Sequence, residues 1–200
     1  MERVITQTLK DTIHGLWGGS EGVQILDMGV NLFHVIFLDD LHMARFLQGE
    51  PWLFDGHALL ITCWEAEMRL EEIEFNTLRC WVQIWNLPLG YVDMEIGRAV
   101  GTHIGQVLEV DSRSNEQERG RYVRVRVNLN IHKPLKRGGL VPMRIGKVQI
   151  VYHYEKICDV CLYCGMLGHE HYACKDRVMD EANKVRQKNK YDSWILVHGE

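Results

Sequence analysis

The sequence predicts an α+β protein in which strand and helix units are followed by a short cysteine- and histidine-rich segment and a polar tail. Residues 122–131 alternate apolar and polar side chains without a slip, as a strand with one buried face does. Ile96, Val100 and Ile104 recur every four residues, which is typical of a helix that packs on a sheet. Of the 200 residues, 46% are apolar and 25% are charged, so the chain can bury a core. No apolar run approaches the roughly 20 residues that span a bilayer, so we expect neither a membrane helix nor a membrane partner.

The first predicted unit, residues 1–68, is acidic and mixes helices with strands. The Gly18-Gly19 pair stops an amphipathic stripe, and Asp39 or Asp40 is expected to cap a second helix. In chain order the expected elements are a helix over residues 4–17, a hairpin of residues 23–28 and 31–38, a helix over residues 40–48 and a strand over residues 58–64.

Residues 69–79 are expected to form an acidic connection to a second unit, residues 80–156, which is basic and rich in strands. Gly97 and Gly101 lie inside its helix at a cost of about 1 kcal/mol each relative to Ala, so we expect them to allow close packing on a sheet. One face of its long alternating strand should be core, and the other wet and basic. The expected elements are a strand over residues 80–87, a helix from Asp93 to Gly105, strands over residues 107–111 and 122–131, and a hairpin over residues 142–154.

Charge is distributed unevenly along the chain. Residues 1–77 carry 4 Lys and Arg against 13 Asp and Glu, a net charge of −9, whereas residues 78–200 carry 19 against 14, a net charge of +5. Residues 119–156 hold ten basic residues and one acid, Glu155, which makes this segment the candidate for contact with a polyanion. A solvated, strand-rich surface would show the same pattern. The side chains expected to contact phosphates are Arg121, Arg124, Arg126, Lys133, Lys136 and Arg137.

A complete metal-ligand pattern, Cys-x2-Cys-x4-His-x4-Cys, lies within residues 158–175 and consists of Cys161, Cys164, His169 and Cys174. Two cysteines separated by two residues present both sulfurs to one ion around a tight turn, and the later His and Cys complete a tetrahedron. This donor set predicts one Zn²⁺. Because the protein fills all four positions, the predicted site is structural rather than catalytic. Metal binding would fold a segment that has no apolar core of its own.

Glycines and neighbouring donors refine the prediction. Gly165 is expected to permit the turn after the second cysteine, and Gly168 to relieve crowding next to the histidine ligand. Cys158 and His171 offer competing donors. Because either would spoil the spacing of the pattern, we expect them to be spectators. The tail after the pattern, residues 176–200, is polar, and its part up to residue 190 predicts a solvent-facing helix or a frayed linker.

The remaining histidines and cysteines form no catalytic set. Cys63 and Cys80 lie in predicted strands and are expected to be small buried side chains. The remaining histidines, which include His34, His57 and His103, have neither ligand-like nor triad spacing. We therefore expect a protein that is not an enzyme and has no small-molecule substrate.

The N-terminus indicates the compartment. It lacks the basic start and the apolar stretch of a secretory signal, so we expect an intracellular protein in a reducing environment. Its cysteines would then be thiols or metal ligands. The pattern leaves open whether the protein resides in the nucleus or the cytoplasm.

Several strings of residues resemble a known family. The metal-ligand pattern is similar to the zinc knuckle of retroviral nucleocapsids and of many retroelement proteins. Other strings resemble a plant family related to the first-open-reading-frame proteins of LINE retrotransposons, which joins a domain of unknown function to such a knuckle. These strings are Pro51-Trp52-Leu53-Phe54-Asp55-Gly56, Trp81-Val82-Gln83-Ile84-Trp85-Asn86-Leu87-Pro88-Leu89-Gly90, Ile96-Gly97-Arg98-Ala99-Val100-Gly101, Lys133-Pro134-Leu135-Lys136-Arg137-Gly138, Tyr154-Glu155-Lys156 and, in the tail, Tyr191-Asp192-Ser193-Trp194.

The resemblance implies that the regions before the knuckle are relatives of the RNA-recognition motif, which has a ferredoxin-like fold. Residues 31–60 have the strand, helix, strand layout of that fold's second half, and residues 82–87 resemble its first-strand motif. The first unit has no evident opening strand. The stacking aromatics of the motif are mostly missing, since Gln83 stands at the first-strand position and Leu32 and His34 at the third-strand positions of the first unit.

These patterns together predict a zinc-containing protein that binds single-stranded RNA or DNA, of the retrotransposon-derived ribonucleoprotein type. Basic side chains would attract phosphates, while Tyr163, Met166 and Tyr172 of the knuckle would meet unstacked bases. The two tyrosines would alternatively cover the loop. A different class of function is a protein-interaction or assembly module, in which the acidic first unit binds a basic partner or the basic second unit of another copy, giving self-association.

Overall fold

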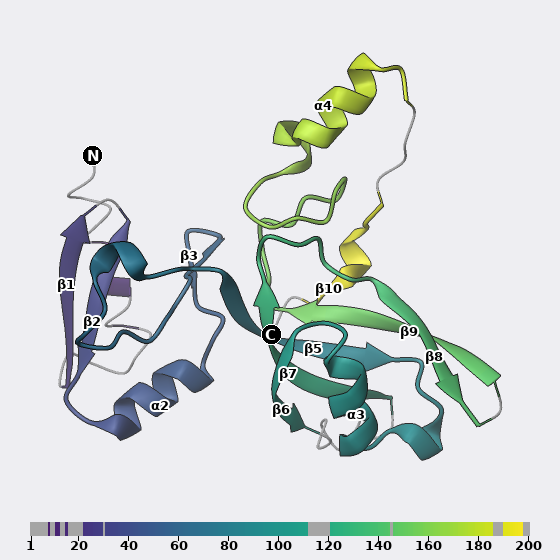
Figure 1. The fold of residues 1–200 in the computed structure, drawn as a ribbon, viewed down its shortest axis with the longest axis horizontal. Helices are drawn as coiled ribbons and strands as arrows, with labels where there is room; N and C mark the ends of the chain where they lie inside the picture. Colours follow the sequence, from purple (N-terminus) through teal and green to yellow (C-terminus); the bar gives the residue numbers. More distant parts are fainter. Residues whose placement is uncertain are drawn as a thin grey trace. The chain divides into compact units, whose positions relative to one another are not determined.

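The computed structural model describes residues 8, 11, 12, 15, 22–29, 31–111, 121–144, 146–185 and 190–197. The chain divides into two compact units, Met1–Asp55 and Gly56–Glu200, which are described separately below (Figure 1). The described residues form a mixed α+β structure with more strand than helix, which confirms the predicted class. None of the described helices is both long and apolar enough to cross a membrane.

The first unit pairs a β-hairpin with one helix. Strands β1 (Val23–Gly29) and β2 (Leu32–Phe37) are antiparallel, and α2 (Asp40–Gln48) follows them. The Asp39 side chain caps this helix by accepting a hydrogen bond of 2.8 Å from the His42 backbone N–H. Phe46, the buried residue of the helix, lies 5.2 Å from the Phe37 ring and stacks on the Trp52 ring at 5.8 Å. The hairpin, the helix and its cap are as predicted, and aromatic contacts hold the helix near β2.

Two expectations for the first 68 residues are not confirmed: one lies mostly outside the described residues, and the other is wrong. The helix expected over residues 4–17 falls mostly outside the described residues. The strand expected over residues 58–64 is wrong, because regular pairing is limited to the short hairpin of β3 (Leu53–Phe54) and β4 (His57–Ala58). Ala58 and Leu60 instead pack on the core of the second unit, so this apolar run is buried by packing rather than by strand pairing. Residues 31–60 consequently provide a strand and a helix, but no third strand that joins β1 and β2.

A six-stranded sheet forms the centre of the second unit. Its strand order is β10-β9-β5-β7-β6, and β8 pairs with the same β9. All pairings are antiparallel except that of β10 with β9. The strands are β5 (Thr77–Trp85), β6 (Gln106–Asp111), β7 (Tyr122–Asn130), β8 (Gly138–Met143), β9 (Gly146–Glu155) and β10 (Leu196–Val197). The short 3₁₀ helices are η1 (Leu70–Glu72), η2 (Leu89–Tyr91), η3 (His171–Ala173) and η4 (Ser193–Ile195).

Helix α3 (Met94–Gly101) packs on strands β6 and β7, as Figure 1 shows. The Asp93 side chain caps it by accepting a hydrogen bond of 2.8 Å from the Ile96 backbone N–H. A Cβ atom at Gly97 would lie 2.5 Å from Val123 Cγ1, and one at Gly101 would lie 2.8 Å from a methyl carbon of Val107. Both glycines therefore bring the helix close to the sheet, as the sequence predicts.

This close approach predicts the effect of a larger side chain at Gly97. We expect Gly97→Leu to lower the free energy of unfolding by about 1–3 kcal/mol, because overpacking displaces the strand residues beneath it. Ala99→Leu is the matched control, since Ala99 lies on the exposed side of the same helix. Urea denaturation of both variants would measure the difference. Equal stability of the two variants would show that α3 does not press on the sheet at Gly97.

The C-terminal tail is only partly the polar segment that the sequence predicts. Helix α4 (Lys175–Ala182) has no buried residue, in agreement with a solvent-facing helix. After it, however, the chain returns to the sheet: Ile195 is fully buried and β10 pairs with β9. Three apolar residues near its end attach the tail to the core: Ile195 is fully buried, and Tyr191 and Leu196 pack against the core.

Candidate metal centre

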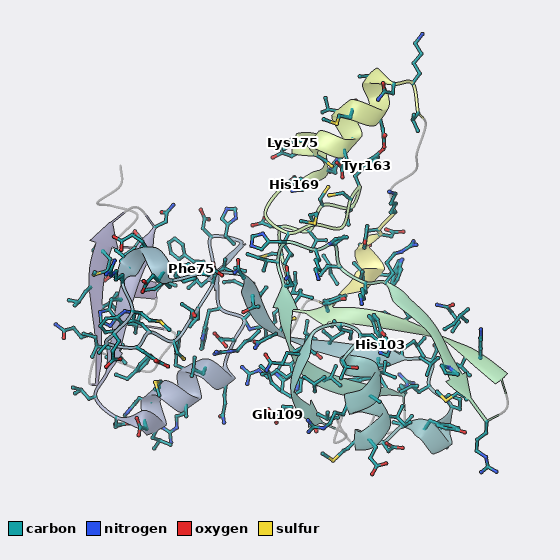
Figure 2. All side chains as sticks on the ribbon, in the orientation of Figure 1. Phe75, His103, Glu109, Tyr163, His169 and Lys175 are labelled. Carbon is teal, nitrogen blue, oxygen red and sulfur yellow. The ribbon has the colours of Figure 1, made fainter. Side chains whose placement is uncertain are left out.

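The four residues of the metal-ligand pattern converge in the structure. The Sγ atoms of Cys161, Cys164 and Cys174 and a ring nitrogen of His169 all lie within 4.8 Å of one another. Cys164 Sγ is 3.5 Å from His169 Nε2. Cys161 and Cys174 are buried, whereas the other two are half-buried. Figure 2 places His169 in the loop below helix α4. This group could hold a metal ion, as the spacing predicts.

Backbone hydrogen bonds build the turn that presents the first two cysteines. The Cys161 N–H donates to the Met166 carbonyl at 2.8 Å, and the Gly165 N–H donates to the Cys161 carbonyl at 2.7 Å. Gly165 has φ +80°, a left-handed conformation that glycine adopts without strain. Its predicted role in the turn is confirmed. Gly168 also has a positive φ, but no atom lies within 4 Å of where its Cβ would be. Its positive φ favours glycine at this position, and the prediction that it relieves crowding next to His169 stays a prediction.

The thiols of Cys164 and Cys174 differ in pKa. Burial is the main cause that raises the pKa of Cys164 to about 12. Burial also raises the pKa of Cys174, but hydrogen bonds from the Arg177 backbone N–H and from His169, among others, outweigh this effect and lower the pKa to about 7. Cys174 directly precedes α4, where backbone N–H groups stabilise a thiolate. These contacts favour the thiolate form of Cys174, next to the place for a cation.

The donor set fits a tetrahedral metal ion. Three thiols and one imidazole are the soft and borderline donors that zinc takes in structural sites. With Zn–S bonds of about 2.3 Å, ligand atoms stand about 3.5–3.8 Å apart. The 3.5 Å between Cys164 and His169 already meets this requirement, and the remaining pairs need only a small contraction. With four protein donors, no coordination position is left for a substrate.

The neighbouring donors behave in three ways. Cys158 and His171 lie outside the ligand group in the described part of the chain, as expected of spectators. Cys80 is fully buried, and burial raises its thiol pKa to about 12, which confirms a core role. Cys63 is exposed, so the prediction that it is buried is wrong. It lies in the run that does not form the expected strand.

The two tyrosines of the knuckle segment have different environments. Tyr163 is 5% exposed, packs against Cys161 and Cys174, and donates a hydrogen bond of 2.5 Å to Asp180 of α4 (Figure 2). That bond is the main cause that raises the Tyr163 pKa to about 12. Tyr163 therefore covers the ligand group, and the expectation that it meets bases is wrong. Tyr172 is 69% exposed and half-buried Met166 lies in the turn, so the structure leaves the Tyr172 ring open to solvent.

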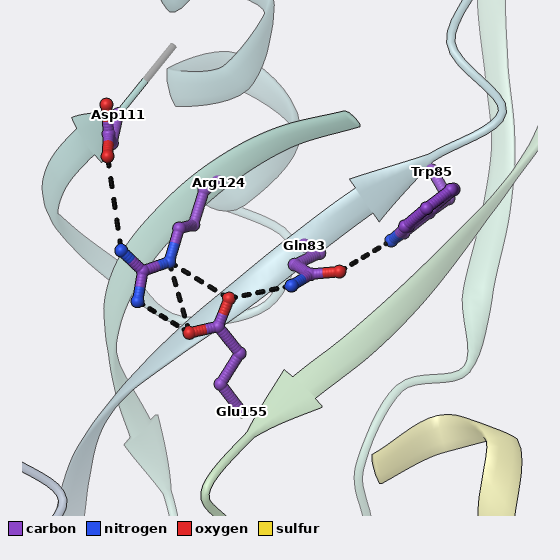
Figure 3. A network of polar contacts seen from close by, with 5 residues as sticks. All are labelled: Gln83, Trp85, Asp111, Arg124 and Glu155. Atoms are coloured by element: carbon purple, nitrogen blue, oxygen red, sulfur yellow. Dashed lines mark hydrogen bonds and ion pairs between the residues drawn. The ribbon is translucent and has the colours of Figure 1, made fainter. Parts of the chain in front are cut away.

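The strand face expected to be wet and basic is instead a closed polar network (Figure 3). Arg124 on β7 donates to Glu155 at 2.6–3.1 Å, and its guanidinium lies 4.1 Å from the centre of the Trp81 ring. Glu155 also accepts from Gln83, which in turn accepts from the Trp85 indole N–H, both at 2.8 Å. The one acid of the basic segment thus neutralises one of its arginines.

Two of the predicted phosphate contacts are therefore corrected. Arg126 is 7% exposed and lies 5.9 Å from the Trp81 ring centre, so it is not accessible to a polyanion. Arg124 forms an ion pair with Glu155 at 2.6 Å. The other four predicted cations remain exposed: Arg121, Lys133, Lys136 and Arg137. The last three lie in the loop that connects β7 to β8.

Contacts that the sequence did not indicate attach the knuckle segment to the sheet. The Leu135 N–H donates to the Gly165 carbonyl at 2.8 Å, and the Tyr191 N–H donates to the Leu162 carbonyl at 3.0 Å. The Tyr191 hydroxyl donates to the Leu135 carbonyl at 2.6 Å. Tyr191 therefore lies between the cationic loop and the knuckle. The sequence signal near this contact is the family-like string Tyr191-Asp192-Ser193-Trp194, which does not by itself indicate what Tyr191 contacts.

Comparison with known proteins connects the N-terminal part to a family. Residues 5–72 match the family model described as Domain of unknown function (DUF4283). The match confirms the part of the predicted resemblance that concerns a domain of unknown function, and it ends before the sheet and the cysteine pattern. A protein of Arabidopsis thaliana, Uncharacterized protein At4g02000, is 24% identical over 146 residues, which are 72% of this chain and 46% of that protein. The chain thus spans less than half the length of this relative. No solved structure matches.

Proposed function

We propose that this chain is a non-enzymatic protein that binds single-stranded RNA or DNA, of the retrotransposon-derived ribonucleoprotein type. The observation that carries the proposal is the closed group of three cysteines and one histidine, which is attached directly to an exposed cationic loop. In this proposal the metal is one Zn²⁺ with a structural role, since four protein donors leave no position for a reacting group. The loop supplies positive charge, and the metal fixes the small tip beside it.

The topology of the sheet supports a relation to the RNA-recognition motif. The order β9-β5-β7-β6 is antiparallel throughout, and α3 connects β5 to β6. This order is that of the ferredoxin-like split βαβ arrangement. The segment between β7 and β9 departs from it, because the cationic loop and β8 replace a second helix.

The proposed contacts divide between two kinds of side chain. Lys133, Lys136 and Arg137 attract phosphates, with Arg121 as a further exposed cation. The exposed Tyr172 ring meets an unstacked base, a contact worth about 1–3 kcal/mol. Gln83 is bonded to Glu155 at the position where the motif usually presents a ring, so the central sheet face is not the proposed contact surface.

Salt dependence tests the proposal. We expect the affinity of the chain for a short single-stranded oligonucleotide to fall steeply with salt concentration. The double variant Lys133→Gln/Arg137→Gln should reduce the slope of log affinity against log salt concentration by about 1.4, or about 0.7 for each lost phosphate contact. Arg98→Gln is the matched control, since Arg98 is an exposed cation on α3. Fluorescence anisotropy across salt concentrations measures the slopes. A wild-type slope near zero would contradict the proposal.

A protein-assembly role has its own support in the first unit. Exposed apolar side chains there include Met28 of β1, Leu38 between β2 and α2, and Leu41 of α2. They lie in a part of the chain with a large excess of acids. Sedimentation with and without an oligonucleotide distinguishes the roles. Salt-sensitive self-association without nucleic-acid binding would favour assembly.

A further inference from the structure

A groove of about 690 Å³ opens in the second unit, next to the knuckle but outside the metal-ligand group. Its lining has three parts: the cationic loop, Gln149 and Val151 of β9, and the aromatic residues Tyr191 and Trp194. The full lining is Lys133, Pro134, Leu135, Lys136, Arg137, Gly138, Gln149, Val151, Tyr191 and Trp194. No acidic side chain belongs to this lining in the described part of the chain. Three cations and two aromatic rings therefore face one open space.

The cationic part of the lining is suited to a phosphate. Lys133, Lys136 and Arg137 are all exposed. Lys136 donates to the His103 backbone carbonyl, and one nitrogen of Arg137 donates to the Lys190 carbonyl at 2.8 Å. These acceptors are neutral carbonyl groups, so the contacts position the side chains without cancelling their charges. Because the groove lacks a carboxylate, the summed field there attracts an anion.

Trp194, in the aromatic part of the lining, is held in place by the chain around it. Asp192 caps η4 by accepting a hydrogen bond of 2.8 Å from the Ser193 N–H, and buried Ile195 anchors the turn. Trp194 lies 5.6 Å from the His153 ring at 58° and remains 42% exposed. A ring that is fixed on one side and open on the other is a stacking platform for a base.

We propose that this groove binds one nucleotide of a single-stranded nucleic acid, with its base stacked on Trp194 and its phosphate bound by Lys133 and Arg137. The inference rests on the proposed function and assigns it a site that includes Trp194 and Gln149. Backbone hydrogen bonds also connect the groove to the knuckle. The N–H groups of Leu135 and Tyr191, two residues of the groove lining, donate to the carbonyls of Gly165 and Leu162, respectively.

The test compares a base-containing oligonucleotide with an abasic strand of the same length. We expect Trp194→Ala to weaken binding of the base-containing strand by about 5- to 150-fold, the equivalent of 1–3 kcal/mol of stacking, and to leave the abasic strand almost unaffected. Trp194→Phe should restore most of the affinity. Trp64→Ala is the matched control, because Trp64 is an exposed tryptophan in the connection before β5.

Charge variants at a second position of the groove distinguish a loss of binding contacts from misfolding of the Trp194 variant. Gln149 is an exposed residue of the groove lining, so Gln149→Glu should weaken and Gln149→Lys should strengthen binding of both strands. Binding of a free mononucleotide, measured separately, shows whether the strand is needed. If the wild type binds the oligonucleotide and the Trp194 and Gln149 variants bind it with the same affinity, the groove assignment is wrong and the proposed function stands. If wild type binds neither strand, the proposed function itself fails. The nucleotide assignment would also be wrong if the protein bound an acidic peptide and the substitutions at Trp194 and Gln149 changed that affinity as much as they change the affinity for the oligonucleotide.

Discussion

Cys164→Ser is expected to remove the metal from this protein and to unfold the knuckle while leaving the sheet intact. The loss of one of four ligands should weaken metal binding by at least about 100-fold, since even changes behind the ligands cost 10- to 100-fold. The ligand group has few apolar residues: Tyr163 is the buried side chain packed between cysteines, and Val160 and Leu167 at its edge pack on the sheet core. We therefore expect metal coordination to be the main interaction that holds the group together. The core of the sheet, by contrast, contains no metal ligand.

Hydrogen exchange with metal analysis measures this result. Amide protection should disappear over residues 160–174 and persist over strands β5, β7 and β9. Cys158→Ser is the matched control, because Cys158 is a half-buried thiol outside the ligand group. Protection near Leu135 should also decrease, since its N–H is bonded to Gly165. A knuckle that stays protected in Cys164→Ser would show that packing, rather than metal, folds it.

Glu155→Ala is expected to have the largest effect on the stability of the sheet. It removes the closer of the two carboxylate partners of Arg124, leaving Asp111 at 4.0 Å, and it removes an acceptor for Gln83. The guanidinium that remains is only partly accessible to water. Breaking a buried pair costs about 3–5 kcal/mol, and the 30% exposure of the Arg124 side chain reduces the expectation to about 2–3 kcal/mol.

Equilibrium urea denaturation measures the change in the free energy of unfolding. Glu155→Gln should cost less, because the amide oxygen still accepts hydrogen bonds although the charge is lost. Glu109→Ala is the matched control, since Glu109 is an exposed acid on β6 (Figure 2). If Glu155→Ala and Glu109→Ala are equally stable, the network in Figure 3 contributes nothing to folding.

Local patterns predicted those parts of the fold that local forces determine. The caps at Asp39 and Asp93, the hairpin of β1 and β2, and the glycine contacts of α3 follow from short-range signals. The metal-ligand group was also predictable, because its four donors lie within fourteen residues and must meet at one point.

The sequence could not show which long-range partners would satisfy polar and apolar groups. Arg124 and Arg126 alternate with core valines, as solvent-exposed residues also would, and only the fold brings Glu155 and Trp81 to them. The run around Leu60 has the composition of a strand, but in the structure it packs on the core of the second unit without joining its sheet. Tyr191 and Ile195 lie in a polar context, and their contacts with the knuckle and the core depend on the chain returning to the sheet.

Titration of the metal-free protein with Co²⁺ is the most direct test of the central claim, because cobalt occupies the same sites as zinc and reports their geometry by its absorption. We predict saturation at one equivalent, with the thiolate charge-transfer and tetrahedral bands of a site that has three sulfur ligands and one nitrogen ligand, and displacement of the cobalt by Zn²⁺. Weak, unsaturable binding with octahedral bands, or the same spectrum from Cys164→Ser, would contradict the account.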